Sequence, residues 1–317
     1  MKKLLTPLFL VAGFLSGLSC LSQTQKKVLR TIVIDPGHGG IDPGARGSFS
    51  TEAGVSLAVS LKLGKAIEQD FPDSRIIYTR TTDVLPGNKS NKTDALRYRA
   101  DLANSSGGDL FIAIHCNSAP PIRHSEIVGY KTVATFKGKG KKKKRIRKKI
   151  PQYRYWTTPN QAEGTETYIW ALGKNDAKVN SVSKIEEDYG EVDSTSTITM
   201  PDPSDPAEKA RMLIYAQNYF RKSLAFADLI EKGFQRQGRT YRGGVKQRND
   251  KGIWVLQATG MPSVLVEIGF MSSREEENYI NSEKGQDEIV SNIITALKEY
   301  KQKLESRQIT SGEKKAF

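Results

Sequence analysis

Cysteine and histidine are scarce: the 317 residues contain two cysteines and three histidines. Cys20 lies beside an apolar leader, so Cys116 has no internal partner once that leader is cleaved or modified. We therefore expect a fold without disulfides that depends on its hydrophobic core. The roughly 290 residues after the leader are enough for one large domain, or for a domain with an insertion.

The chain also lacks an apolar run long enough to cross a membrane comfortably. In Met1–Leu21, Lys2 and Lys3 precede a short apolar stretch that is broken by polar residues, proline and glycine. This order is typical of a secretory signal, so we expect residues 1–21 to direct export to the periplasm or the outer envelope. Two fates are open for Cys20: lipidation, as in bacterial lipoproteins, or plain cleavage of the leader.

Acidic residues are too few to balance the basic ones, and the formal net charge is +14. The excess is concentrated in Lys137–Lys149 (KGKGKKKKRIRKK), which holds ten Lys and Arg residues. Such a run predicts a solvated, disordered loop that could attract anionic envelope polymers or lipid headgroups. A basic run also suits nucleic acid, but the export signal argues against that partner, so we expect none.

Strand-like and helix-like segments alternate through the rest of the chain, which is typical of an α/β fold with a parallel sheet. Buried helix faces are predicted at Val59, Leu63, Ala66 and Ile67, at Leu213, Gln217, Phe220, Leu224 and Ala227, and at Ile289, Ile293, Ala296, Leu297 and Tyr300. We predict strands at Thr31–Ile34, Arg75–Thr79, Asp109–His115, Gly164–Trp170 and Ser263–Glu267, two short strands within Gly243–Ala258, and helices at Thr51–Gln69, Ala95–Asn104, Ala207–Gly233 and Gln286–Leu304.

One domain is expected at residues 27–305, followed by a polar, frayed tail at 306–317. A basic insertion at 118–163 interrupts the domain and has too little apolar sequence to form a core, although Val128–Phe136 could form one strand of a hairpin. A flexible segment at 174–206 is the second interruption. Within it Lys174–Asp188 could be a short helix, and the proline-rich remainder is a connector.

The chain has no H-E-x-x-H motif, yet four side chains suited to metal chemistry fall at one predicted sheet edge. His38 follows the first strand after an Asp-Pro-Gly turn, His115 ends the third strand, Glu267 ends the last, and Glu52 opens the first helix. Singly, each is more often a structural residue. Together, two imidazoles and a carboxylate form a catalytic zinc set, and the second carboxylate suits a general base.

Several motifs carry a family resemblance between about residues 31 and 302. IDPGHGGIDPGARG, FIAIHCN, GTETYIW, GVKQ and MPSVLVEIGFMSSREEE resemble, in this order, the zinc-dependent N-acetylmuramoyl-L-alanine amidases of the periplasmic cell-separation type. The resemblance implies a twisted, mostly parallel sheet of about six strands with helices on both faces. It also implies Zn²⁺ held by His38, Glu52 and His115, with Glu267 as the catalytic carboxylate.

The implied substrate is peptidoglycan, in which hydrolysis of the amide between N-acetylmuramic acid and L-alanine helps daughter cells to separate. Related enzymes can carry a helix that blocks the zinc site until an activator protein displaces it. Lys174–Pro206 occupies the corresponding region, and a plain surface helix with a linker is the alternative. Many relatives have a small residue at Cys116, so its thiol is a candidate supporting group or adventitious ligand, behind the histidines.

The basic insertion could flank the substrate groove and take the place of a wall-binding domain. Envelope or membrane association through Lys137–Lys149, or through a lipidated Cys20, follows from the same features. Two other functions stay open. One is a wall-binding protein that keeps the fold without turnover, and the other is a basic envelope-anchoring or nucleic-acid-binding protein.

Overall fold

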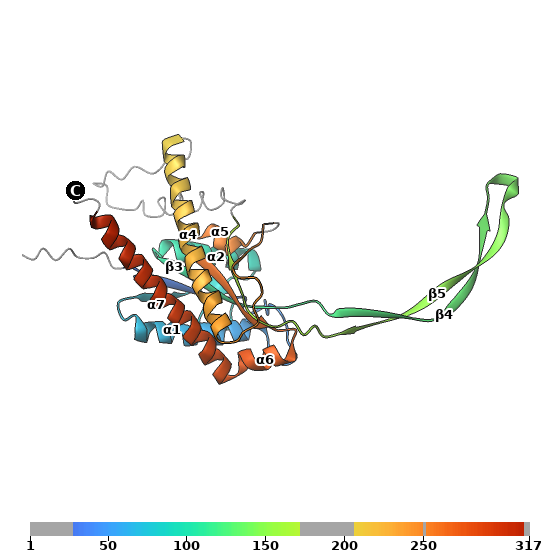
Figure 1. Cartoon of the computed structure of the whole chain (residues 1–317), viewed down its shortest axis with the longest axis horizontal. Coiled ribbons are helices and arrows are strands. Elements are labelled where there is room, and N and C mark those ends of the chain that lie inside the picture. The colour runs from blue at the N-terminus through green and yellow to red at the C-terminus, as the bar shows by residue number, and fades with distance from the viewer. Residues whose placement is uncertain (1–27, 172–205, 250–251, 314–317) are drawn as a thin grey trace, which may run out of the picture.

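The computed structural model describes residues 28–171, 206–249 and 252–313. The leader, Cys20 and nearly all of the segment at 174–206 lie outside these residues. The body is built on a six-stranded sheet of order β2-β1-β3-β8-β6-β7 (Figure 1). Its strands are β1 (Thr31–Pro36), β2 (Arg75–Tyr78), β3 (Leu110–Asn117), β6 (Glu166–Ile169), β7 (Lys246–Gln247) and β8 (Ser263–Phe270).

Four neighbouring strands of this sheet are parallel, and β6 runs antiparallel to β8. The mostly parallel α/β sheet predicted from the sequence is therefore confirmed. Strands β1 and β8 are buried along their whole length, as β-branched, apolar strands between two helix layers should be. The helices are α1 (Glu52–Asp70), α2 (Lys92–Ser105), α4 (Pro206–Arg236), α5 (Trp254–Ala258), α6 (Arg274–Asn281) and α7 (Glu283–Glu313), with short 3₁₀ turns at Pro86–Asn88 and Gly140–Lys142.

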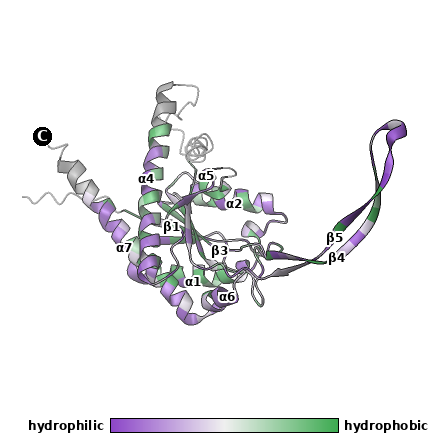
Figure 2. Cartoon of the chain, turned by 45° about the vertical axis from the view of Figure 1, so that its right-hand side comes forward, coloured by the Kyte–Doolittle hydropathy of each residue, from purple (hydrophilic) through white to green (hydrophobic). Residues whose placement is uncertain are grey.

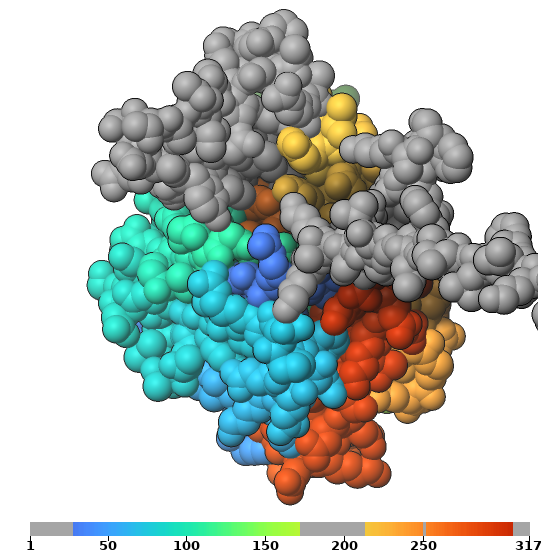
Figure 3. All heavy atoms as spheres, turned by 90° about the vertical axis from the view of Figure 1, so that its left-hand side faces the viewer, coloured from blue at the N-terminus to red at the C-terminus, as the bar shows by residue number. Residues whose placement is uncertain are grey.

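Helices cover both faces of the sheet. Alternate residues of the central strands point to opposite faces, so Ile32 and Ile34 enter one core while Val33 enters the other. The larger core lies under α1, α4 and α7, and the smaller one lies under α2 and α5. Figure 3 shows α7 between α1 and α4 on the outside of the larger core. No helix among the described residues is long and apolar enough to span a bilayer.

Two of the three predicted helix faces match the structure. Val59, Leu63 and Ile67 of α1 are buried, with Ala66 at the margin, and the five residues named for α7 are all buried. The face predicted for α4 is wrong, because Gln217 and Leu224 are exposed. The helix lies between the sheet and α7 and turns a neighbouring stripe inward, formed by Ala216, Ser223, Phe226, Ala227, Ile230 and Phe234.

Two further segments differ from the expectation. The second strand predicted within Gly243–Ala258 is helix α5, whose Val255 and Leu256 fill the smaller core. Its β-branched and aromatic residues suggested a strand. The segment is a helix instead because it connects the edge strand β7 to the central strand β8, across the face of the sheet. The tail expected to fray after Glu305 continues as helix to Glu313.

The basic insertion is a long β-hairpin, and the disordered loop predicted for Lys137–Lys149 is wrong. Strands β4 (Ile122–Lys137) and β5 (Lys144–Thr158) pair antiparallel as a separate two-stranded sheet that projects from the body (Figure 1). Charge repulsion favoured disorder, but the basic residues beyond the turn lie opposite the mostly uncharged strand β4, and cross-strand pairing satisfies their backbone. The suggestion of a hairpin strand at Val128–Phe136 is confirmed.

Candidate active site

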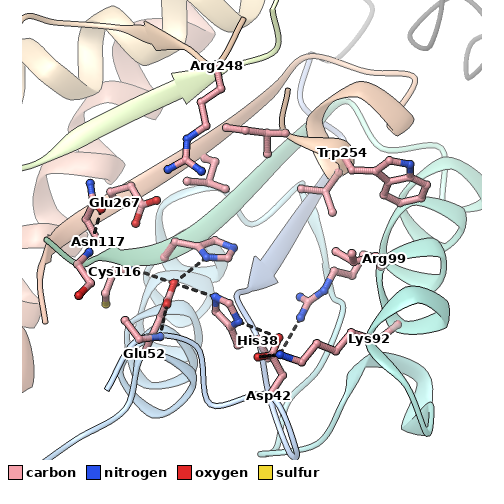
Figure 4. Close-up of a pocket in the computed structure, with 18 of the residues that line it drawn as sticks. His38, Asp42, Glu52, Lys92, Arg99, Cys116, Asn117, Arg248, Trp254 and Glu267 are labelled. Atoms are coloured by element: carbon pink, nitrogen blue, oxygen red, sulfur yellow. Dashed lines mark hydrogen bonds and ion pairs between the residues drawn. The ribbon is translucent and has the colours of Figure 1, made fainter. Parts of the chain in front are cut away.

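The four predicted site residues converge at the carboxyl edge of the parallel strands. His38 lies two residues beyond β1, and Glu52 opens α1. His115 lies in β3 directly beside Glu267 of β8 in the strand register. The sequence predicted that Glu267 ends its strand, but β8 continues for three more residues beyond it. All four side chains line one pocket (Figure 4).

Glu52 is the centre of a compact hydrogen-bond cluster. Its Oε1 lies 2.8 Å from Nδ1 of His115 and 3.1 Å from Nε2 of His38. The backbone N–H of Cys116 donates to the same oxygen at 3.1 Å, and the N–H of Ala45 donates to Oε2 at 2.8 Å. On the far side of His38, Nδ1 lies 2.9 Å from Oδ2 of Asp42. The carboxylates therefore hold both imidazole rings in place.

Within this cluster, Glu52 carries a negative charge. Burial by itself raises the pKa of Glu52, but hydrogen bonds from His115 and His38 outweigh burial and hold this pKa well below its usual range. Burial lowers the pKa of His38, yet hydrogen bonds to Glu52 and Asp42 leave it above its ordinary value. An ionised carboxylate between two imidazoles is a site that attracts a cation.

The donor set fits a zinc ion. His38, Glu52 and His115 each offer one ligand atom, and these atoms lie within 4.8 Å of one another. Two imidazole nitrogens and a carboxylate oxygen are a common zinc set that leaves a position open for water. The backbone leaves room beside them: a Cβ on Gly37 would lie 2.5 Å from the His115 ring, and one on Gly44 would lie 2.5 Å from Glu52 Oε2.

Cys116 is not placed to act as a ligand. It follows His115 in the strand, so its side chain points to the opposite face and packs in the larger core. Burial raises the pKa of its thiol well above the usual value, which disfavours the thiolate that a metal requires. Its backbone N–H contacts the site by donating to Glu52.

Glu267 differs from Glu52 in its surroundings. It is only 7% exposed, and within the described part of the chain its Oε2 has no hydrogen-bond partner. Burial raises its pKa to about 7, with a further contribution from Glu52 and an opposing one from His115. A carboxyl group with a pKa near neutrality can both accept and return a proton at physiological pH.

Two buried arginines support the turn that carries His38, and the sequence analysis did not identify them. His38 has a φ of 58°, an unfavourable left-handed conformation for a histidine. Arg99 Nη2 donates to the His38 carbonyl at 2.6 Å, and Arg80 Nη2 donates to the Gly37 carbonyl at 2.6 Å. Arg99 also pairs with the buried carboxylate of Asp35. No pattern in the sequence distinguished these arginines from surface residues.

The pocket above the cluster has a volume of about 490 Å³. Its walls come from the site residues and from α2 and the segment around α5, with Trp254 at 44% exposure near its mouth. Arg248 projects into the same space, and Lys92 pairs with Asp42 at 2.6 Å (Figure 4). Such a site is large enough for part of a polar polymer and carries cations for anionic groups.

A solved amidase structure resembles the fold of this chain. The CwlD amidase of Clostridioides difficile, solved in complex with the GerS lipoprotein, is 22% identical with a TM-score of 0.52. The match covers 86% of this chain and 98% of that one. At this identity the likeness supports a shared fold and nothing finer.

Sequence relatives are cell-wall amidases by name. The chain is 24% identical over 271 residues to an uncharacterised cell wall amidase of Bacillus anthracis, covering 86% of this chain and 35% of that protein. It is 25% identical over 275 residues to AmiC of Escherichia coli, covering 85% of this chain and 52% of AmiC. The chain thus spans only about a third to a half of these two relatives. The model of the family Amidase_3, N-acetylmuramoyl-L-alanine amidase, matches residues 32–299, and the chain belongs to this family.

Proposed function

We propose that this protein is a zinc-dependent N-acetylmuramoyl-L-alanine amidase that hydrolyses the bond between N-acetylmuramic acid and L-alanine in peptidoglycan. The observation that carries the proposal is the pairing of a three-residue metal set with a separate buried carboxylate. His38, Glu52 and His115 present their ligand atoms together, and Glu267 lies beside His115 with an Oε2 that has no hydrogen-bond partner among the described residues. Membership of the amidase family supplies the bond class.

In this mechanism His38, Glu52 and His115 would hold a zinc ion. Bound zinc would acidify a water molecule and polarise the scissile carbonyl. Glu267 Oε2 accepts the proton of the attacking water and delivers it to the nitrogen of the leaving L-alanine. Asp42 accepts a hydrogen bond from Nδ1 of His38, so Nε2 is the nitrogen that would be available to a metal.

We also propose a cellular setting for the reaction. The charged and apolar leader supports export, and wall cleavage would serve remodelling and the separation of daughter cells. The Clostridioides difficile CwlD amidase was solved with the GerS lipoprotein, which supports an activator protein as a partner type here. Association with the envelope through Lys137–Lys149 or a lipidated Cys20 belongs to the same proposal.

The Glu267→Gln variant tests the assigned chemistry. We expect its hydrolysis of a soluble muramyl peptide to fall by roughly 10²–10⁴-fold, because the amide keeps the volume of the side chain and loses the basic oxygen. Its zinc content, measured by atomic absorption, should equal that of the wild type. Glu275→Gln, an exposed change on α6, is the matched control. A fully active Glu267→Gln enzyme would refute the mechanism, and a wild type that binds wall without releasing peptide would favour a binding protein.

A further inference from the structure

The hairpin at Ile122–Thr158, here called the arm, grows directly from the active-site edge of the sheet. It is inserted between β3, which carries His115, and β6, which pairs with β8 beside Glu267. Its base is tied to the body: Asn160 Nδ2 donates to the Pro120 carbonyl at 3.1 Å, and the Ala119 N–H donates to Ser272 Oγ at 3.0 Å. The base of the arm therefore lies at the same edge of the sheet as the catalytic pocket, and the rest of the arm projects away from the body (Figure 1).

The arm extends about 50 Å, since its strands of 16 and 15 residues rise roughly 3.3 Å per residue. Strands β4 and β5 form a separate sheet and pair only with each other (Figure 1). An isolated two-stranded hairpin is at best marginally stable in water. A ribbon of this length with no covering layer is suited to contact another molecule along its length.

The charge of the arm is almost entirely positive. It carries thirteen Lys and Arg residues and one acidic residue, Glu126, which pairs with Arg154. That is the only ion pair of the arm within the described residues. The remaining basic side chains concentrate around the tip at Lys137–Lys149. The charge complement of this surface is an extended array of anionic groups.

Aromatic rings lie on both faces of the arm, mostly nearer the body. In the strand register Tyr153 and Tyr155 share one face, with ring centres 5.9 Å apart, and Trp156 lies on the other face, stacked on His124 at 5.3 Å. Their exposure runs from 42% to 74%. Figure 2 shows apolar and polar residues mixed along both strands.

We propose that the arm binds the peptidoglycan meshwork and so keeps the enzyme on the polymer that contains its substrate, an inference that rests on the proposed function. Polypeptides that lie on a bilayer place their apolar residues on one side, whereas this ribbon presents rings and cations on both. A polymer mesh surrounds an inserted arm from both sides. Peptidoglycan offers stem-peptide carboxylates to the basic tip and the apolar faces of sugar rings to the aromatic residues.

The test measures binding to insoluble sacculi in the full-length Glu267→Gln background, in which turnover does not remove the ligand. The tip variant converts Lys141, Lys142, Lys143 and Lys144 to Gln. Its charge-matched control converts four exposed body lysines to Gln: Lys65, Lys232, Lys284 and Lys303. The ring variant converts Tyr153, Tyr155 and Trp156 to Ser. The tip and ring variants are also made with Glu267 intact and assayed on a soluble muramyl peptide, and Tm is recorded for each.

We expect the tip variant to bind sacculi at least tenfold more weakly than the control variant, with a shallower dependence on salt. The ring variant should lose the binding that survives high salt. Soluble-peptide hydrolysis and Tm should change little, because in the described part of the chain β4 and β5 form a sheet of their own, separate from the sheet that carries the site. Sacculus binding by the tip variant equal to that of the control variant would overturn the proposal.

Binding by the wild type to vesicles of equal parts phosphatidylglycerol and phosphatidylethanolamine, but not to sacculi, would also overturn it in favour of a membrane. Failure of the amidase proposal has a different outcome. In that case the wild type would bind sacculi through the arm and release no peptide from either substrate, which would support the arm and refute the enzyme.

Discussion

At the scale of single residues, two carboxylates beside His115 differ in the protonation state that their surroundings favour. Glu52 accepts hydrogen bonds from two imidazoles and two backbone N–H groups, which stabilise its ionised form. Glu267 is buried without such donors to Oε2, and its pKa rises to about 7. This contrast supports the proposal that the first binds the metal and the second transfers the proton.

His38→Ala tests the ligand set. Removing one of three ligands should weaken zinc binding by more than the roughly 10–100-fold that loss of a supporting hydrogen bond costs. Asp42→Asn keeps all three ligands and weakens the contacts of the Asp42 carboxylate with His38 Nδ1 and Lys92, so its loss should fall within that smaller range. Competition titration with a chromophoric chelator measures both. Unchanged zinc affinity in His38→Ala would remove it from the ligand set.

Arg99→Met tests the buried support of the His38 turn. The change leaves the Asp35 carboxylate without its charge partner and removes the donor to the His38 carbonyl. Breaking a buried pair on one side should lower the free energy of unfolding by about 3–5 kcal/mol, measured by urea denaturation. Arg97→Met, an exposed change in the same helix, should stay within about 0.5 kcal/mol. Equal effects in the two variants would contradict the supporting role of Arg99.

At the scale of elements, α6 holds the loop that leads into Glu52. Glu277 accepts hydrogen bonds from the N–H groups of Ser48, Phe49 and Ser50, at 2.7 to 2.9 Å. The loop closes with Thr51, whose side chain caps α1 by accepting from the Gly54 N–H. Helix α6 thus positions Glu52, the proposed metal ligand, which belongs to helix α1.

Glu277 also predicts a dependence of stability on pH. Burial raises its pKa, but the backbone hydrogen bonds prevail and lower it to about 2, below the ordinary value of 4.5. Its contribution is therefore complete above pH 4.5 and is lost as the pH falls from about 4.5 to about 2. Glu277→Gln should flatten that part of the stability curve, measured by urea denaturation between pH 2.5 and 6. A slope equal to that of Glu275→Gln would contradict this account.

Sequence patterns correctly predicted the elements that bury a regular apolar pattern in a core. β1, β3, α1 and α7 bury regular apolar patterns in a core, so periodicity was sufficient. α5 is too short to show a clear period. It is helical rather than extended because this segment connects the edge strand β7 to the central strand β8, a tertiary feature that the local sequence does not show. The arm has no core at all, so its basic composition suggested disorder while its strand pairing stayed hidden.

Part of the candidate site was also predicted from the sequence. His38, His115 and Glu267 follow or occupy recognisable strands, and the structure brings them together with Glu52. Arg80 and Arg99 were missed because they act through backbone carbonyls, which depend on the tertiary turn and leave no mark on spacing. Asp42 was missed for a similar reason, since its contact with His38 forms only when the Gly39–Asp42 turn closes.

At the scale of the whole molecule, a compact α/β body carries a long basic arm beside its catalytic pocket (Figure 1). The two parts have different tasks in this account. The body holds the metal and the proton-transferring carboxylate, and the arm holds the polymer. A soluble substrate would need only the body, whereas an intact wall would need both.

The most direct test of the central claim is mass spectrometry of the products released from purified sacculi by the zinc-loaded wild type. The account predicts free stem peptides with an unmodified L-alanine amino terminus, and glycan strands whose N-acetylmuramic acid ends in a free lactyl carboxylate. Shortened stem peptides still attached to glycan, or glycan fragments that keep their peptides, would contradict it and identify a peptidase or a glycosidase.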